Sequence, residues 1–420
     1  MIDAAAGLSV LHVVVRASDT NSQYNEHCLP VMHERRITVC SLFPAAVQPP
    51  PQLVLIEGDG TVRGCYRALC EALRARTYDI VHVHSASSAL LTLLVYARLR
   101  RSRQDLVLTL HNSWPNFRRR NRLFLWLVAA LFPVVVACGD AAFASLPRAL
   151  RRLTRRLEVV PNGVDVDRVD RVLHHHAFGL TGAPGQEGLT VLAVNRLIPI
   201  KNPDTVMEAF VRAATPQDEL VMIGEGALGT QLAAAVQQSG LESQLRLTGG
   251  LPRDDVYRHM QGAAVFVSAS SGEGLPVSVL EAMACRCPVV LSDIPPHREI
   301  AKHAPAVRLV TPGDVDAFAD AIRRALRMPG FERYQVGEDL RRVAVRHFSV
   351  TAMNKGYGRV YRSVADHTNA SAAQRLRSSA RQPAQRARRR AVAWVAVALL
   401  GAIAGTWYGG SHPPQYRATT

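Results

Sequence analysis

The feature that most constrains the fold is an alternation of short apolar runs with longer helical stretches, which occurs twice along the chain. Uninterrupted Val, Ile and Leu runs are typical of parallel strands covered by helices on both faces. In the first half the expected strands are Val10–Val15, Ile37–Leu42, Ile80–Val83, Leu106–Leu110, Val134–Ala137 and Leu157–Val160, and the expected helices include Cys65–Arg76, Ser88–Arg100 and Ala141–Arg152. In the second half the expected strands are Thr190–Val194, Glu219–Ile223, Leu245–Thr248, Val265–Ser268, Pro288–Leu291 and Ala306–Val310. The pattern predicts an α/β protein with two successive parallel-sheet domains.

A stretch rich in Gly and Pro, Thr181–Gly188, separates the two series and is expected to be the linker between the domains. The boundaries predicted from it are 1–180 for an N-terminal domain and 181–348 for a C-terminal domain. An amphipathic stretch at 349–366 is expected to be a helix that crosses back toward the N-terminal domain. Ligands of open parallel sheets bind beyond the carboxyl ends of the strands, so two facing sheets predict a cleft between them.

The C-terminal end has an unusual composition. Residues 367–390 are Ala, Arg, Ser and Gln with almost no large apolar groups, which predicts a disordered basic linker. Residues 391–410 carry no charge and are long enough for a transmembrane helix. The arginines just before them place the large N-terminal part in the cytosol, as a single-pass protein of the cell membrane. A buried C-terminal helix is the alternative, and Gly401 and Gly405 have the spacing of a helix-dimerisation face, compatible with a homodimer.

The formal net charge of +16 is concentrated in two places. Eleven arginines face two aspartates between Arg101 and Arg156, and eight arginines follow His367 without any acid. Such clusters indicate anionic partners. The segment Phe117–Phe132 fits a helix lying on an anionic membrane surface, and it also fits an amphipathic core helix. The clusters lack interleaved aromatic residues, which argues against nucleic acid. Seven scattered cysteines indicate a reducing compartment.

The stretch Ser268–Pro288 has the pattern of an anion and sugar site. Gly272 and Gly274 flank Glu273 in a loop, and Glu281 follows eight residues later, inside a predicted helix. Glycines allow close backbone approach, and the amides of Gly274 and Leu275 precede a helix N-terminus that favours an anion. Glu273 could accept hydrogen bonds from sugar hydroxyls, and Glu281 could bind the two hydroxyls of a ribose.

This stretch resembles the donor-binding motif of the retaining glycosyltransferases of family 4, which have the GT-B fold of two facing Rossmann-like domains. Other motifs of that family follow in the expected order over residues 8–365. They are the D-[IV]-[IV]-H-x-H element at Asp79–His84, the T-x-H element ending at His111, the V-x-P-N-G-V-D turn at Val159–Asp165, the segment Val194–Asn202 that contains Arg196 and Lys201, and the turn Ile223–Gly226 with Gly224 and Gly226.

The resemblance implies a role for each matched residue. Arg196 and Lys201 would neutralise the donor diphosphate, Glu281 would hold the ribose, and Glu273 with the following amides would hold the transferred sugar. His111 would reach a sugar hydroxyl across the cleft, and each of these side chains also has an ordinary structural reading. His84 is interpreted as a cleft residue on the acceptor side, and His82 as structural.

One loop departs from the family pattern. The loop after the first strand, Ser18–Glu26, has no glycine, whereas relatives usually have adjacent glycines that approach the phosphates. Its polar side chains are predicted to serve the acceptor instead, with Asn25 and Glu26 as candidates. Enzymes of this kind need no bound metal or other cofactor, because Arg and Lys supply the positive charge. The tract His174–His176 has no Cys or Asp at ligand spacing, so we predict no metal there.

The sequence therefore predicts a retaining glycosyltransferase that uses a UDP- or GDP-sugar and a glycan or lipid-linked acceptor at the cytoplasmic membrane face. An epimerase of the same fold is a less favoured alternative, because that class lacks the paired glutamates with this Arg and Lys. A catalytically silent scaffold or partner subunit is the second alternative, favoured only by the altered loop at Ser18–Glu26.

Overall fold

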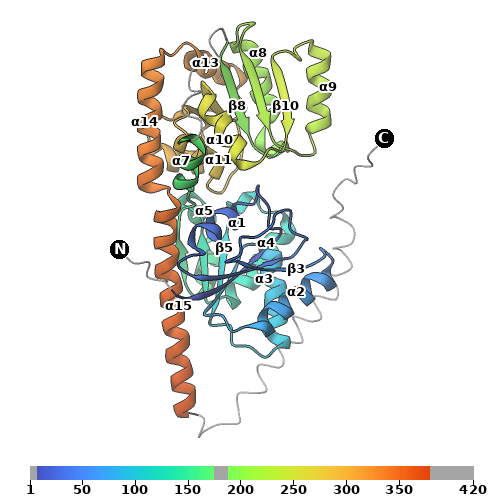
Figure 1. The fold of residues 1–420 in the computed structure, drawn as a ribbon, viewed down its shortest axis with the longest axis vertical. Coiled ribbons are helices and arrows are strands. Elements are labelled where there is room, and N and C mark those ends of the chain that lie inside the picture. The colour runs from blue at the N-terminus through green and yellow to red at the C-terminus, as the bar shows by residue number, and fades with distance from the viewer. Residues whose placement is uncertain (1–6, 175–187, 379–420) are drawn as a thin grey trace.

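The computed structural model describes residues 7–174 and 188–378, with side chains described up to residue 368. These residues form two lobes stacked end to end, each built on its own sheet, and a column of two helices, α14 and α15, runs along one side of both (Figure 1). The two-domain Rossmann-like α/β prediction is confirmed at this level.

The N-terminal lobe contains a seven-stranded sheet in the order β3-β2-β1-β4-β5-β6-β7, in which all pairs are parallel. Its strands are β1 Ser9–Val14, β2 Arg36–Ser41, β3 Val54–Glu57, β4 Ile80–Val83, β5 Leu106–Leu110, β6 Val134–Ala137 and β7 Leu157–Val159. Its helices are α1 Ser22–His27, α2 Val62–Ala75, α3 Ala86–Arg98, α4 Arg119–Leu131, α5 Asp140–Ser145 and α6 Arg148–Leu153. The next helix, α7 Val166–His174, packs into the core of the C-terminal lobe (Figure 1).

The C-terminal lobe contains a six-stranded parallel sheet in the order β10-β9-β8-β11-β12-β13. Its strands are β8 Thr190–Val194, β9 Glu219–Ile223, β10 Leu245–Gly249, β11 Val265–Ser268, β12 Val289–Ser292 and β13 Arg308–Val310. Its helices are α8 Pro203–Ala213, α9 Gly229–Ser239, α10 Arg253–Gly262, α11 Val277–Ala284, α12 Pro295–Ala301, α13 Val315–Leu326 and α14 Gly330–His347, after which α15 spans Val350–Ser378.

Alternate residues of each N-terminal strand supply two separate cores. Leu11, Val13 and Val81 pack toward α2, α3 and α4, whereas Val10 and Val14 pack on the opposite face. Both faces are apolar, which is why the strands appear in the sequence as continuous runs.

The opposite face is covered largely by α15. Met353, Tyr357 and Tyr361 of this helix are buried in the same core as Val10 and Val14. The chain enters the helix beside Val164, whose amide nitrogen donates to the Phe348 carbonyl over 2.8 Å and whose carbonyl accepts from Val350 over 2.8 Å. The crossing stretch predicted at 349–366 thus forms a helix that packs under the N-terminal sheet.

Three local differences from the sequence prediction have physical reasons. The strand β3 is partly exposed, so its short apolar run gave a weak signal. The helix predicted at Ala141–Arg152 is two helices, α5 and α6, because Pro147 lacks an amide hydrogen and cannot continue the first one. The helix α14 was not predicted, because most of its residues are polar or charged.

The C-terminal predictions have two outcomes. Residues 367–378 continue α15 as helix, where we expected a disordered linker; Ala, Arg and Gln are good helix formers. The predicted span 391–410, with Gly401 and Gly405, and the rest of the linker, lie outside the described residues. Within the residues that are described, no helix combines the length and apolar character needed to cross a membrane.

Candidate active site

The loop between β11 and α11 carries the predicted donor residues and lies against the N-terminal lobe. A Cβ atom added at Gly274 would clash with the backbone carbonyl of His111, and one added at Gly272 would clash with the Asn116 side chain. Neither glycine needs a left-handed backbone, since neither has a positive φ. The close approach of the two lobes therefore requires glycine at Gly274, where the clash is with backbone, whereas a Cβ at Gly272 would have to displace the Asn116 side chain.

Hydrogen bonds fix this approach. The backbone carbonyl of Glu273 accepts from Ser113 Oγ over 2.7 Å and from Asn116 Nδ2 over 3.1 Å. Both donors belong to the segment that follows β5, directly after His111. Asn162 of the interdomain turn also donates from Nδ2 to the Leu275 carbonyl over 2.8 Å. The structure thus brings the predicted residues Glu273, Leu275 and His111 to one place between the lobes.

The side chain of Glu273 is paired with Lys201, and both side chains are nearly buried. Lys201 ends a short 3-10 helix, Pro199–Lys201, and the next residue, Asn202, has the left-handed angles φ 46° and ψ 53°. Asparagine tolerates this conformation, which explains how it stands where relatives usually have glycine. Two of the predicted catalytic residues therefore meet as an ion pair.

Arg196 lies just after β8 and is exposed, and no ion pair engages it within the part of the chain that the structure describes. The turn with Gly224 and Gly226 packs against the same segment. A Cβ at either glycine would clash with the backbone carbonyls of Asn195 or Leu197, and Gly224 has a φ of +142°. The turn at Gly224–Gly226 therefore supports the backbone that carries Arg196 rather than standing apart from it.

Glu281 lies on α11 and is already engaged. Its Oε1 atom accepts from the Tyr257 hydroxyl over 3.2 Å and lies 3.2 Å from Nη1 of Arg253. Arg253 forms a second, closer ion pair with Glu26 of the N-terminal lobe. Burial raises the pKa of the Glu26 carboxyl. Arg253 thus links the predicted ribose carboxylate to the opposite lobe, and a ribose must share or replace this contact.

Two of the three acceptor candidates, Asn25 and Glu26, lie at the same interlobe contact. The side-chain oxygen of Asn25 accepts from Arg168 Nη1 over 2.9 Å, and its amide donates to backbone carbonyls of its own loop, including Ser18 over 3.0 Å. Asn25, Glu26, Arg168 and Arg253 line a cavity of about 520 Å³. The prediction for Asn25 and Glu26 as acceptor residues stays a prediction, since both carry interlobe contacts.

The sequence analysis did not predict the interlobe contacts of Arg253 and Arg168. Arg253 is 227 residues away from Glu26 in the chain, so only the folded structure pairs them. No spacing motif connects such positions. The glycine-free loop Ser18–Glu26 was the one sequence feature that indicated an unusual contact in this region. The helix α1 in this loop brings Asn25 and Glu26 to the C-terminal lobe.

Five histidines gather in the N-terminal lobe around His111, and four of them are buried. His84 Nδ1 lies 3.0 Å from His111 Nε2, and His84 Nε2 lies 3.0 Å from His12 Nδ1, so three rings form a chain. His27 stands edge-on to His84 and His111, with ring centroids 4.9 and 5.6 Å away. His82 is bonded through both nitrogens, to the Tyr361 hydroxyl at 2.6 Å and to Thr109 Oγ1 at 2.7 Å.

These imidazoles are held neutral by their surroundings. Burial lowers the pKa of His111 to about 4 and, together with the positive charge of Arg35, that of His12 to about 3. Burial also lowers the pKa values of His27, His82 and His84. In the neutral form each ring has one donor and one acceptor nitrogen, which lets the chain of His12, His84 and His111 form.

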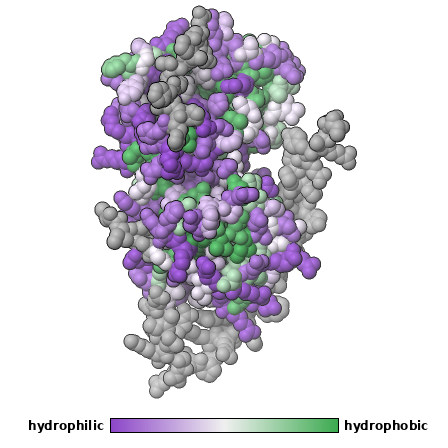
Figure 2. Space-filling view, in the orientation of Figure 1, coloured by the Kyte–Doolittle hydropathy of each residue, from purple (hydrophilic) through white to green (hydrophobic). Residues whose placement is uncertain are grey.

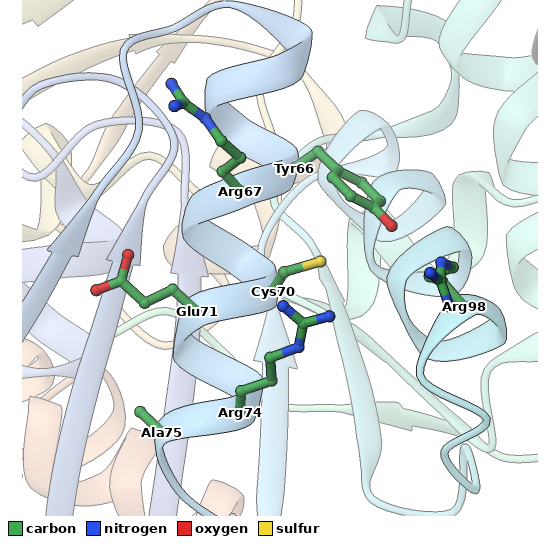
Figure 3. A pocket seen from close by; sticks show the side chains of 7 residues that line it. All are labelled: Tyr66, Arg67, Cys70, Glu71, Arg74, Ala75 and Arg98. Atoms are coloured by element: carbon green, nitrogen blue, oxygen red, sulfur yellow. The ribbon is translucent and has the colours of Figure 1, made fainter.

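A second depression lies between α2 and α3, away from every predicted site residue (Figure 3). It has a volume of about 670 Å³. Tyr66, Cys70 and Arg74 point from α2 toward Arg98 on α3 in this view. The depression is basic, but Arg67 at its rim is paired with Asp59, and no side chain of the predicted donor site reaches it.

Comparisons with known proteins agree with this geometry. Residues 11–168 match the family model described as Glycosyltransferase Family 4, and residues 183–341 match the one described as Glycosyl transferases group 1. The chain is 25% identical over 299 residues to the putative glycosyltransferase EpsD of Bacillus subtilis, which covers 67% of this chain and 76% of that protein.

Two further relatives are named for specific transfers. A UDP-Gal:alpha-D-GlcNAc-diphosphoundecaprenol alpha-1,3-galactosyltransferase of Escherichia coli is 26% identical, over 61% of this chain and 68% of its own length. A phosphatidyl-myo-inositol mannosyltransferase of Mycobacterium leprae is 27% identical, over 69% of this chain and 74% of its own length.

Solved structures share the architecture. Anabaena Alr3699/HepE in complex with UDP and glucose superposes with a TM-score of 0.65 at 18% identity, over 85% of this chain and all of that one (100%). Sucrose-phosphate synthase from Thermosynechococcus elongatus gives a TM-score of 0.66 at 18% identity, over 85% and 99% of the two chains. The two family models together span both lobes, and the chain therefore belongs to glycosyltransferase family 4, with the GT-B fold.

Proposed function

We propose that this glycosyltransferase moves a sugar, with retention of configuration, from a UDP- or GDP-sugar to a hydroxyl of a glycan or lipid-linked acceptor. The observation that carries the proposal is the contact of the Gly272–Gly274 loop with the backbone of His111. This contact gathers Lys201, Glu273 and His111 from two lobes around one cleft.

The donor side supplies the positive charge that a leaving diphosphate needs. Arg196 is exposed and free to reach phosphate oxygens, whereas Lys201 is paired with Glu273 and would have to share or exchange this contact to bind the diphosphate. We expect the transfer to proceed without a bound metal for that reason. The acceptor hydroxyl would attack the anomeric carbon on the face from which the diphosphate leaves, and a phosphate oxygen would take the hydroxyl proton; this front-side course rests on family analogy.

A location at the cytoplasmic face of the membrane completes the proposal. The helix α4 buries Phe124, Leu125 and Val128 but leaves Leu123 at 67% exposure, with exposed arginines at its start. On the face seen in Figure 2, an apolar area surrounds the position of α3 and α4. One side of α4 is therefore core, and we propose that its exposed remainder rests on anionic headgroups.

The first experiment is thermal stabilisation of the detergent-purified protein by UDP, GDP and ADP. We expect a shift with one nucleotide and a lost or strongly reduced shift in the Glu281→Ala variant. Glu208→Ala removes an exposed carboxylate of α8 in the same lobe and serves as the matched control. A shift that survives in Glu281→Ala would remove the ribose role of this residue.

Two further outcomes separate the alternatives. If no nucleotide shifts the melting temperature of a well-folded sample, the catalytically silent scaffold gains over the enzyme. If a donor is found, NMR of the early product gives the anomeric configuration. Inversion instead of retention would contradict the proposed stereochemistry and leave the donor site intact.

A further inference from the structure

We propose that His27, His84 and His111 form a binding site for a divalent transition-metal ion, best suited to Zn²⁺, on the N-terminal wall of the cleft. The transfer reaction proposed above does not need this ion. Because the ion would hold His111, we infer that it inhibits transfer, and this second part rests on the proposed function.

The geometry comes from three different elements. His27 ends α1, His84 follows β4 and His111 follows β5, and their ligand atoms all lie within 4.8 Å of one another. In a tetrahedral zinc site with Zn–N bonds of about 2.0–2.1 Å, neighbouring nitrogens are about 3.4 Å apart. His84 Nδ1 and His111 Nε2 are 3.0 Å apart, so they need to separate by only about 0.4 Å and give up their shared hydrogen bond to reach this edge. The His27 nitrogen lies within 4.8 Å of the other two ligand atoms, so it must move closer by at most about 1.4 Å.

His27, His84 and His111 are a better metal site than a neighbouring group of three histidines, because each of them has a ring nitrogen available to a metal. A second group of imidazoles, His12, His82 and His84, is equally close. However, both nitrogens of His82 are used by Tyr361 and Thr109, so that ring has no lone pair to offer. His27 is buried at 4% exposure, and its ring makes no hydrogen bond within the described part of the chain. A neutral imidazole whose nitrogens are not engaged by protein groups can offer its lone pair to a metal.

Proton positions also fit. A metal on His84 Nδ1 requires the other nitrogen, Nε2, to carry the proton, and that nitrogen lies 3.0 Å from His12 Nδ1 as its acceptor. His12 Nε2 is itself buried without a hydrogen-bond partner. His12 would thus orient His84 from behind, as outer-shell acceptors do for metal-bound histidines. Neutral imidazoles need only change tautomer, so the ion can bind without displacing charge from the protein.

The charge balance identifies the remaining ligand. Three neutral imidazoles do not neutralise the two positive charges of the ion. The positive charge of Arg35 also acts on His27, so the site has an excess of positive charge. The fourth position is therefore expected to take an anion such as chloride, hydroxide or phosphate. All-nitrogen coordination also suits Cu²⁺, Ni²⁺ and Co²⁺, whereas Mg²⁺ and Ca²⁺ prefer oxygen ligands and should not bind.

The test is titration of the full-length protein with Co²⁺, followed by its visible absorption, and with Zn²⁺ in competition. The protein carries His174→Gln, His175→Gln and His176→Gln, so that this histidine tract cannot contribute. We expect an intense tetrahedral Co²⁺ spectrum that Zn²⁺ removes and Mg²⁺ does not. His27→Gln should abolish the spectrum, and His12→Gln should weaken the affinity by about 10- to 100-fold.

His303→Gln is the matched control, because His303 stacks on His347 in the C-terminal lobe with ring centroids 4.4 Å apart. The thermal melt in EDTA checks that each variant is folded. A Co²⁺ spectrum that survives in a folded His27→Gln protein overturns the site, as does its loss in His303→Gln. If Zn²⁺ inhibits transfer by the wild type but not by His27→Gln, the proposal that the bound ion inhibits the enzyme is supported. Absence of transfer activity leaves the spectroscopic test unaffected, so the two proposals fail separately.

Discussion

The two walls of the cleft differ in how they handle charge. The C-terminal wall keeps its charges and pairs them, as Glu273 with Lys201 and Glu281 with Arg253. Around His111, the N-terminal wall buries imidazoles and holds them neutral, with His84 and His111 joined by a hydrogen bond; the charge of Glu26 lies apart from them, paired with Arg253. The charged wall suits a charged leaving group, whereas the neutral wall suits sugar hydroxyls. The comparison predicts that electrostatic catalysis resides on one side of the cleft.

The largest expected effect tests this division directly. Lys201→Ala should lower kcat/KM by about 10²- to 10³-fold, because it removes a charge that stabilises the leaving diphosphate. His111→Asn, assayed in EDTA, should cost about 10-fold, the value of one neutral hydrogen bond. Steady-state kinetics with the identified donor measure both.

Lys302→Ala, which removes an exposed lysine of the same lobe, is the control for the loss of positive charge. Equal losses for Lys201→Ala and His111→Asn would contradict the division of roles. A double variant with Glu273→Ala adds information: if Lys201 and Glu273 act as a unit, the two losses will not add.

The next effect concerns the contact that joins the walls. Gly274→Ala places a methyl group against the His111 carbonyl and should lower kcat/KM by about 10²-fold, as expected when catalytic groups are displaced by about 1 Å. The φ of Gly274 is not in the left-handed region, so alanine imposes no backbone strain of its own. Gly330→Ala, where an added Cβ meets nothing within 4 Å, is the control. Wild-type activity of Gly274→Ala would mean that the lobes need not approach this closely.

A third prediction concerns the neutral character of the N-terminal lobe. Asp105 accepts a hydrogen bond from the Tyr96 hydroxyl over 2.8 Å, and burial raises its pKa from 3.8 to about 6. The folded state therefore binds more protons than the unfolded state between about pH 4 and 6, and stability falls as the pH rises through this window.

Asp105→Asn should remove this contribution. The free energy of unfolding of the variant minus that of the wild type should be about 2 kcal/mol higher at pH 7 than at pH 4. Urea unfolding at both pH values, monitored for the N-terminal lobe, provides the measurement. An unchanged difference between variant and wild type would show that the pKa of Asp105 is the same in the folded and unfolded protein.

The smallest expected effect concerns Arg253, which contacts residues of both walls. Arg253 is shared between Glu26 and Glu281, so Glu26→Gln should leave it more fully with Glu281. Nucleotide affinity should then fall by about 3-fold, because a ribose competes with the arginine for the same carboxylate. Isothermal titration at two salt concentrations checks this. Tighter nucleotide binding would instead show that Glu26 holds Arg253 in the way of the ribose.

The two walls of the cleft also differ in how well the sequence predicted them. The donor loop around Glu273 is contiguous, and its glycines and helix start are local requirements, so the pattern indicated both the fold and the site. The N-terminal wall is assembled from β1, α1, β4 and β5, and nothing local tells that His12 and His27 meet His84. Arg253 escaped for the same reason, since its importance comes from a residue on the other lobe. Proline at 147 was local, and its effect on the helix could have been anticipated.

The covering of the N-terminal sheet by α15 has a consequence for biosynthesis. Tyr357 and Tyr361 complete a core whose other members, such as Val10 and Val14, are translated first. The entire C-terminal lobe emerges from the ribosome in between, and it can fold while one face of the earlier sheet is still bare. A helix made after the whole C-terminal lobe is thus what closes the first-made lobe, and a nascent chain that stops before residue 350 leaves that apolar face open to chaperones and proteases.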